Sequence, residues 1–289
     1  MELGGWDAAA VCAKAVTYAA TFGAAGAIFF LIYAGSLLLQ PQLARIRRLI
    51  GILLVAAALA SCARILLSAA AMSGEAAGML DTGFARMILG AGEGRALAVR
   101  FAGLSLAALA LLPRPSLRTP AFIGAALATI SFAFVGHMQR LLPNLVPCLL
   151  LCIHLLCAAF WLGALAPLWI AARDGSCSQL AALASRFGKI ALGAVLLLLC
   201  AGASLLWTLI GSAAPFWSSG YGRMMAVKLL FVAALLSVAA VNKLYLTPRL
   251  LNGHARAVTH FKRNVQVEVI IGALVLLITA TFTTVAGPP

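Results

Sequence analysis

Long apolar segments recur along the whole chain, and short stretches that carry most of the charged residues separate them. A run of about 18 or more apolar residues is long enough to cross the hydrocarbon core of a bilayer as an α-helix. The pattern therefore predicts eight membrane-spanning helices. Their expected bounds are residues 8–39, 49–72, 96–112, 120–138, 146–172, 187–210, 221–246 and 265–285.

The links between these runs are short. Pro113 and Pro115 close the third run, because proline cannot continue a helix. Between the second and third runs, Leu80, Phe84 and Met87 share one face at helical spacing in a more polar segment, which predicts a short helix lying on the membrane surface. No link exceeds about 25 residues, which is too short for an independent domain. We therefore expect one transmembrane domain over residues 1–289 and no soluble domain.

Composition supports this reading of the pattern. Of the 289 residues, 64% are hydrophobic and 10% are charged, and the mean hydropathy is +1.07. A water-soluble fold has no core large enough to bury so much apolar surface. The sequence therefore predicts an all-α, multi-pass membrane protein built as a bundle of eight helices.

The formal net charge of +14 is typical of some nucleic-acid-binding proteins. Here, however, the bases lie in short links, where they set membrane topology and contact anionic lipid headgroups. This excludes nucleic acid as a partner and, by the positive-inside rule, predicts that both termini lie in the periplasm of a bacterial inner membrane. The links after the first, third, fifth and seventh runs hold Arg45, Arg47, Arg48, Arg114, Arg118, Arg173, Arg186, Lys189, Lys243, Arg249, Arg256, Lys262 and Arg263.

Two histidines stand out within the fourth and fifth runs. His137 ends the fourth run, and His154 lies about 10 Å into the fifth at 1.5 Å per residue. Both are expected in the periplasmic half of two antiparallel neighbours, joined by a turn that contains Pro143 and Pro147. A titratable side chain inside the membrane is costly and is by default a functional candidate, and imidazole is the commonest protein metal ligand.

Methionines on the same side of the membrane add soft ligands. Met138 follows His137 directly, and Met72 and Met79 lie near the same boundary. Thioether and imidazole together suit copper, Cu(I) in particular, although Cu(II) stays open. The alternative is that these methionines only pack and that the histidines bond backbone carbonyls.

Basic residues also fall toward the periplasmic ends of the spans, where few acids are available. Arg64 and Arg95 are expected to extend to the headgroups. Arg100, Arg223 and Lys228 lie deeper and are candidates for an entrance or a partner-facing surface. Because a basic entrance repels a bare cation, copper is expected to arrive on a donor protein.

Other candidates lie nearer the cytoplasm. Glu268 and Asn242 are possible exit ligands, but pairing of Glu268 with Lys243 or with a neighbouring amide is favoured. The remaining candidates, for which solvation or packing is favoured over metal binding, are His254, His260, Cys148 and Cys152.

The sequence contains no P-loop and no aspartyl-phosphate motif, so pumping by ATP is not expected and neither is an enzyme. A carrier or channel therefore remains as the expected mechanism of transport. The competing chemistry is a membrane oxidoreductase subunit, because the same histidine pair could ligate b-type haem axially.

Several of these residues together resemble the CopD/PcoD copper-resistance family. The resemblance implies an eight-helix inner-membrane protein that moves copper from periplasm to cytoplasm, with a periplasmic CopC-like protein as donor. It also implies that His137 and His154 are the family's intramembrane histidines, while Met138 stands where a small residue is more usual. Association of the chain into a homo-oligomer is left open. The matching residues are Gly136 with His137, the run from His154 to Leu168, Gly222, Arg223, Lys228, Asn242, Pro248 and Glu268.

Overall fold

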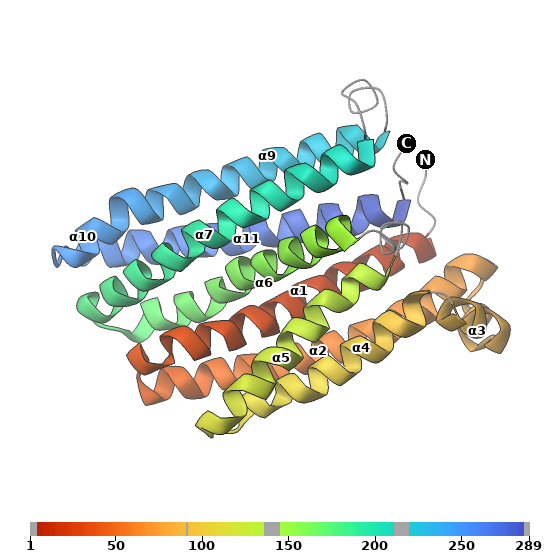
Figure 1. Ribbon diagram of the computed structural model, residues 1–289, viewed down its shortest axis with the longest axis horizontal. Helices are drawn as coiled ribbons and strands as arrows, with labels where there is room; N and C mark the ends of the chain where they lie inside the picture. Colours follow the sequence, from red (N-terminus) through yellow and green to blue (C-terminus); the bar gives the residue numbers. More distant parts are fainter. Residues whose placement is uncertain (1–4, 91, 136–144, 211–219, 286–289) are drawn as a thin grey trace.

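The computed structural model describes residues 5–90, 92–135, 145–210 and 220–285, and it is helical throughout, with no β-strand in these ranges (Figure 1). Two of the helices are short, α3 (Thr82–Gly90) and α10 (Thr247–Leu251). The long helices are α1 (Gly5–Ala34), α2 (Gln40–Ser73), α4 (Gly92–Ala107), α5 (Arg118–Ile130), α6 (Leu145–Asp174), α7 (Cys177–Ile210), α9 (Gly220–Val241) and α11 (Ala255–Val285).

Eight segments within the described ranges are long and apolar enough to cross a membrane, which confirms the predicted all-α membrane fold. Two of them reach that length because the helix tightens into a 3-10 turn at its end: α4 continues to Leu111 and α5 to Phe134. The seventh passes from α9 through a π-helical turn, Asn242–Leu246, into α10. The apolar runs therefore identify every span, including these irregular ones.

Several helices are longer than the apolar pattern indicates. α2 begins at Gln40, α7 at Cys177 and α11 at Ala255, each well before the expected start. Hydropathy locates the part of a helix that lies in hydrocarbon, whereas backbone hydrogen bonding continues through arginines and polar residues into the headgroup layer. The long link expected over 247–264 is accordingly reduced to three residues between α10 and α11.

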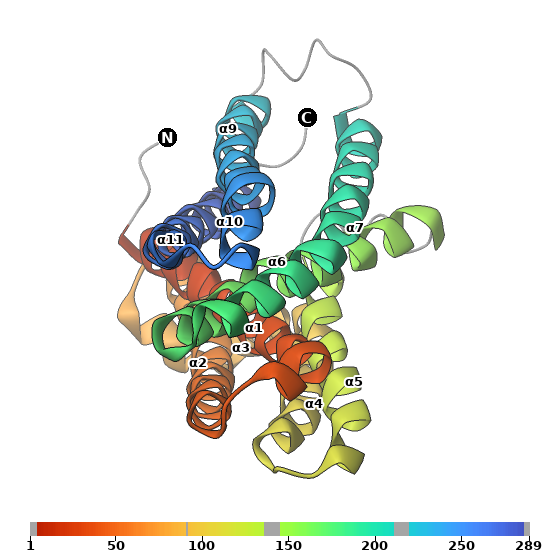
Figure 2. The ribbon, with the colours of Figure 1, turned by 90° about the vertical axis from the view of Figure 1, so that its left-hand side faces the viewer.

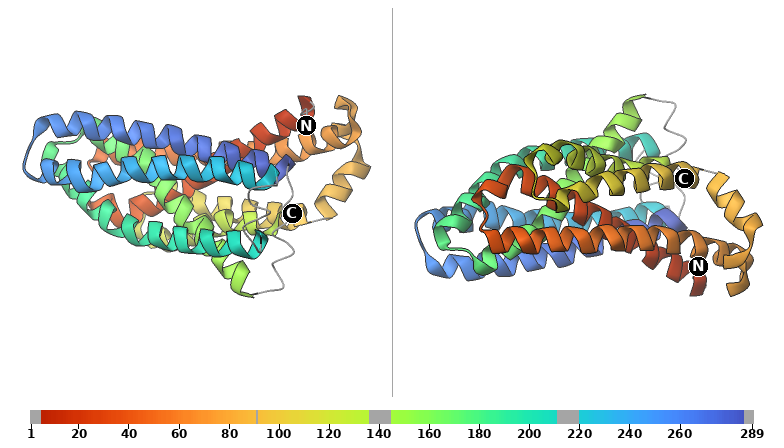
Figure 3. Two further views of the ribbon diagram at one scale, coloured as in Figure 1. Left: turned by 90° about the horizontal axis from the view of Figure 1, so that it is seen from above. Right: turned by 90° about the horizontal axis from the view of Figure 1, so that it is seen from below.

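The helices run nearly parallel or antiparallel to one long axis. The two described ends of the chain and α3 lie at one end of the bundle, the termini end, and α10 lies at the other (Figures 1 and 3). The links from α1 to α2, α4 to α5 and α6 to α7 also lie at that other end (Figure 1), which we call the arginine-rich end because it carries the thirteen bases of the odd-numbered links. Seen along the axis, α1 and α6 lie centrally, with α4 and α5 on one side and α9 and α11 on the other (Figure 2).

Helices α1 and α6 cross at two glycines. A Cβ atom on Gly26 would lie 2.2 Å from the carbonyl oxygen of Ala159, and one on Gly163 would lie 2.1 Å from that of Phe22. Only glycine allows backbones this close, as in small-residue packing of membrane helices. The crossing fixes the relative positions of α1 and α6, and hence of the candidate site on α6.

The polar segment between α2 and α4 forms the predicted short helix, α3, preceded by a 3-10 turn at Ala76–Leu80. Leu80 and Met87 expose 87% and 53% of their surface. Leu80 ends the 3-10 turn and Met87 lies on α3, and exposed apolar side chains on both at the end of the bundle agree with a position against the membrane surface.

Candidate functional site

His154 lies on α6, where its ring faces α7. Its Nδ1 atom is 3.1 Å from the carbonyl oxygen of Leu198. A carbonyl only accepts hydrogen bonds, so Nδ1 donates, and in the neutral form of the ring the lone pair then lies on Nε2. Nε2 has no hydrogen-bond partner among the described residues. This is the arrangement that metal-binding histidines show, with one nitrogen held by a carbonyl and the other directed at a ligand.

A glycine on α7 makes room for this ring. A Cβ atom on Gly202 would lie 3.0 Å from Cε1 of His154 and 3.1 Å from Nδ1. The backbone of α7 therefore forms one wall of the imidazole site, which the sequence did not reveal because Gly202 is one small residue among many.

The other predicted copper ligands are not brought together with His154. His137 and Met138 lie outside the described residues. Met72 is half exposed at the end of α2, and Met79 is partly buried in the turn before α3. No group of three His, Cys, Asp or Glu side chains able to hold a metal occurs within the described ranges.

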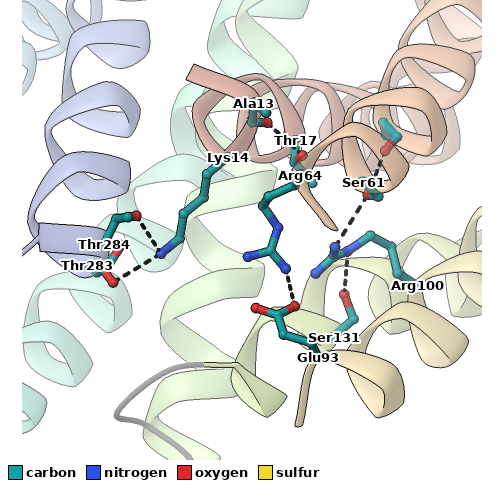
Figure 4. Close-up of polar contacts among 11 residues, drawn as sticks. Ala13, Lys14, Thr17, Ser61, Arg64, Glu93, Arg100, Ser131, Thr283 and Thr284 are labelled. Carbon is teal, nitrogen blue, oxygen red and sulfur yellow. Dashed lines mark hydrogen bonds and ion pairs between the residues drawn. The ribbon is translucent and has the colours of Figure 1, made fainter. Parts of the chain in front are cut away.

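The termini end instead buries a group of charges, which we call the cation cluster: Lys14, Arg64, Arg100 and the single acid Glu93 (Figure 4). Arg64 forms an ion pair with Glu93. The expectation that Arg64 extends to the headgroups is therefore wrong. It is 9% exposed, because α4 places Glu93 within its reach. Arg95, by contrast, is exposed as expected.

Arg100 is the most deeply buried cation, with none of its surface exposed. Its Nε donates to the hydroxyl of Ser131 over 3.0 Å, and its Nη1 donates to that of Ser61 over 3.3 Å. Its guanidinium lies 4.2 Å from the ring centre of Phe132, a cation–π contact. Arg100 thus lies inside the bundle, between α2, α4 and the end of α5.

Lys14 on α1 completes the cluster, and the sequence analysis missed it. Its ammonium group donates to the backbone oxygen of Thr283 over 3.1 Å and to the hydroxyl of Thr284 over 3.2 Å. The lysine is 9% exposed. The available signal was a lysine inside an apolar run with no acid one helical turn away.

The remaining entrance candidates lie apart from Arg100. Lys228 is partly buried, with its ammonium group 5.5 Å from the ring centre of Phe282 on α11, and Arg223 is exposed. Phe282 directly precedes Thr283, whose backbone oxygen accepts the hydrogen bond from Lys14. Lys228 and Lys14 therefore contact neighbouring residues of the last turns of α11.

In the half nearer the arginine-rich end, Glu268 on α11 is 3% exposed and accepts a 2.7 Å hydrogen bond from the side-chain amide of Asn242. The side-chain oxygen of Asn242 accepts one from Asn264 over 3.0 Å. The expected pairing with an amide occurs, while Lys243 donates to the carbonyl of Gly188 instead. Asn242 opens the π-helical turn, a feature frequent at functional sites.

The lesser candidates show no shared site. His254 is exposed, with Nδ1 3.2 Å from the carbonyl of Arg249, and His260 is an exposed residue of α11. Cys148 and Cys152 are partly buried free cysteines on α6. These positions fit solvation and packing.

Comparison with known protein families decides the identity of the chain. Residues 6–141 match the family described as copper resistance protein D-like, N-terminal domain, and residues 181–282 match copper resistance protein D. The chain belongs to the copper resistance protein D family. The two matches together span most of the sequence, in the order of the two parts of one protein.

Family membership links this multi-pass membrane protein to copper resistance. The N-terminal match includes all four residues of the cation cluster, and it also includes His137. Neither match includes residues 142–180, so His154 and the run to Leu168 lie between the two. No curated protein and no solved structure matches the chain.

Proposed function

We propose that this protein moves copper across the bacterial inner membrane, from periplasm to cytoplasm, as a carrier or channel that uses no ATP and catalyses no reaction. Family membership supports the copper substrate. The positive-inside distribution supports a topology with the termini end in the periplasm and the arginine-rich end in the cytoplasm.

One observation carries the choice of ligand. His154 donates from Nδ1 to the Leu198 carbonyl, which in the neutral ring leaves the Nε2 lone pair available for a metal ion. Loss of the hydrogen-bond partner that orients a metal-binding histidine typically weakens metal binding about 10- to 100-fold. His154 is accordingly the copper ligand of the proposal, with His137 and Met138, the last two residues of the fourth apolar run, as its companions.

The rest of the route follows the polar side chains. A CopC-like periplasmic donor delivers copper at the termini end, because the cations there oppose entry of a bare metal ion. Glu268 and Asn242 are the polar groups that the ion meets toward the cytoplasm, and the membrane potential favours inward movement of a cation by about 2.3 kcal/mol per charge and 100 mV.

Metal analysis and an absorption spectrum of detergent-purified protein test the ligand assignment. We expect about one copper per chain in the wild type and loss of that copper in His154→Ala. His260→Ala is the matched control, since that imidazole is exposed, and it should keep its copper. Equal copper content in wild type and His154→Ala contradicts the proposal, and a Soret band lost in His154→Ala assigns the histidine to b-type haem instead.

A finer test changes the wall of the site without touching the ligand. Gly202→Ala places a methyl group against the His154 ring and should weaken copper binding about tenfold. Gly193→Ala on the same helix meets nothing within 4 Å and should bind copper as the wild type does. Identical affinity in the two variants would show that α7 does not orient the ligand.

Transport is measured in proteoliposomes of known orientation, with copper supplied on the side of the termini end. We expect uptake that stops in His154→Ala and that increases with a negative interior potential. Uptake that continues unchanged in the variant removes His154 from the route.

A further inference from the structure

The cation cluster does not balance its own charge. Lys14, Arg64 and Arg100 carry three positive charges, and Glu93 supplies one negative charge. All three cations are at most 9% exposed. Burying an unpaired ion costs several kcal/mol even after relaxation, so two charges that no described acid compensates call for a counter-ion.

Two N–H groups of this cluster are also without partners. Nε of Arg64 and Nη2 of Arg100 are buried and have no hydrogen bond in the described structure. The two guanidinium groups lie side by side, with Arg100 directed toward Arg64 (Figure 4). Guanidinium donors in a low-dielectric site bind anions strongly.

A hollow borders the cluster on the side of Arg64. It has a volume of about 330 Å³, and its lining includes Arg64, Glu93, Ser68, Met72 and Met87. A water molecule could satisfy the free N–H groups, but it would leave the net charge unchanged. A carboxylate of a macromolecular partner does not reach Arg100, which has no exposed surface.

We propose that the cation cluster binds one small inorganic anion, of the size and charge of chloride, held by Nε of Arg64 and Nη2 of Arg100. The site is separate from His154 and involves no copper, so the proposal stands independently of the transport function. Its role is to neutralise the buried excess charge where α2, α4 and α5 meet.

Equilibrium binding of radiolabelled chloride to purified protein, at constant ionic strength made up with gluconate, tests the proposal. We expect saturable binding of about one chloride per chain, displaced by bromide and not by gluconate. In Arg100→Gln we expect binding at least tenfold weaker. Arg95→Gln removes an exposed arginine from the same helix and should bind chloride as the wild type does.

A second variant covers the case in which Arg100→Gln does not fold. Ser61→Asp places a carboxylate beside Nη1 of Arg100 and so supplies a fixed counter-charge. It should lose chloride binding while unfolding in gluconate at or above the wild-type temperature. The proposal is overturned by non-saturable chloride binding in the wild type, by unchanged binding in Ser61→Asp, or by displacement with inorganic phosphate and not with bromide, which assigns the site to an oxyanion.

Discussion

At the termini end three cations share one carboxylate, whereas nearer the arginine-rich end one carboxyl group lies among neutral amides. Arg64 and Glu93 meet as ions, and Arg100 is held by hydroxyl groups and an aromatic ring. Glu268 meets Asn242 and no cation among the described hydrogen bonds and ion pairs. The first group depends on charge and the second on hydrogen bonding, so the same substitution should act differently in each.

Glu93→Gln should have the largest effect, because it removes the one negative charge of the cation cluster. Breaking a buried ion pair costs about 3–5 kcal/mol, and we expect about 3 kcal/mol here, since Glu93 keeps 21% of its side chain exposed. Thermal unfolding in detergent measures the change. The control is Glu75→Gln at an exposed position, which should leave the unfolding temperature unchanged. Adding Arg64→Gln to Glu93→Gln should restore most of the stability that Glu93→Gln loses.

Ser131→Ala should come next, because it removes the acceptor for Nε of Arg100 and leaves a buried guanidinium with one bond fewer. Hydrogen bonds to charged groups contribute about 1.5–3 kcal/mol, so a loss of about 2 kcal/mol is expected. The control is Ser237→Ala, whose exposed hydroxyl bonds only the carbonyl of Ala233. Equal unfolding temperatures for the two variants would contradict a role for Ser131.

Substitution of Glu268 sharpens the contrast with Glu93. Glu268→Ala leaves the buried amide of Asn242 without its acceptor and should cost about 1–2 kcal/mol. Glu268→Gln keeps an acceptor oxygen and removes only the charge, so its stability should stay within about 0.5 kcal/mol of the wild type. If glutamine proves as costly at 268 as at 93, the carboxyl group must have a cationic partner and the comparison fails.

Thr247→Val should have the smallest effect. The Thr247 hydroxyl donates over 2.8 Å to the carbonyl of Asn242, across the π-helical turn, and valine keeps the shape without the donor. One neutral hydrogen bond contributes about 1 kcal/mol. Thr259→Val at an exposed position of α11 serves as the reference in the same unfolding experiment.

The fold was largely predictable because the apolar runs alone identify all eight spans. The ends of the helices were not predictable, because backbone hydrogen bonds continue past the hydrocarbon boundary through polar residues such as Gln40. The amide partner of Glu268 was expected, since Asn242 was already recognised as a polar residue at the same depth.

The cation cluster was only partly predictable. Arg64 and Glu93 are 29 residues apart in separate helices, and no local pattern indicates that they meet. Lys14 was missed because its partners lie at the other end of the chain, on α11. The wall that Gly202 provides for His154 also depends on how α6 and α7 pack, which hydropathy does not specify.

The glycine crossing of α1 and α6 is the point at which the backbones of these two central helices touch. With Gly26 and Gly163 in direct backbone contact, the two helices cannot slide past each other without collision, so any change in their crossing angle has to pivot at this contact. His154 lies nine residues before Gly163 on α6, which corresponds to about 13 Å along the helix axis. A change of about 10° in the tilt of α6 about Gly163 would therefore move the imidazole by roughly 2 Å.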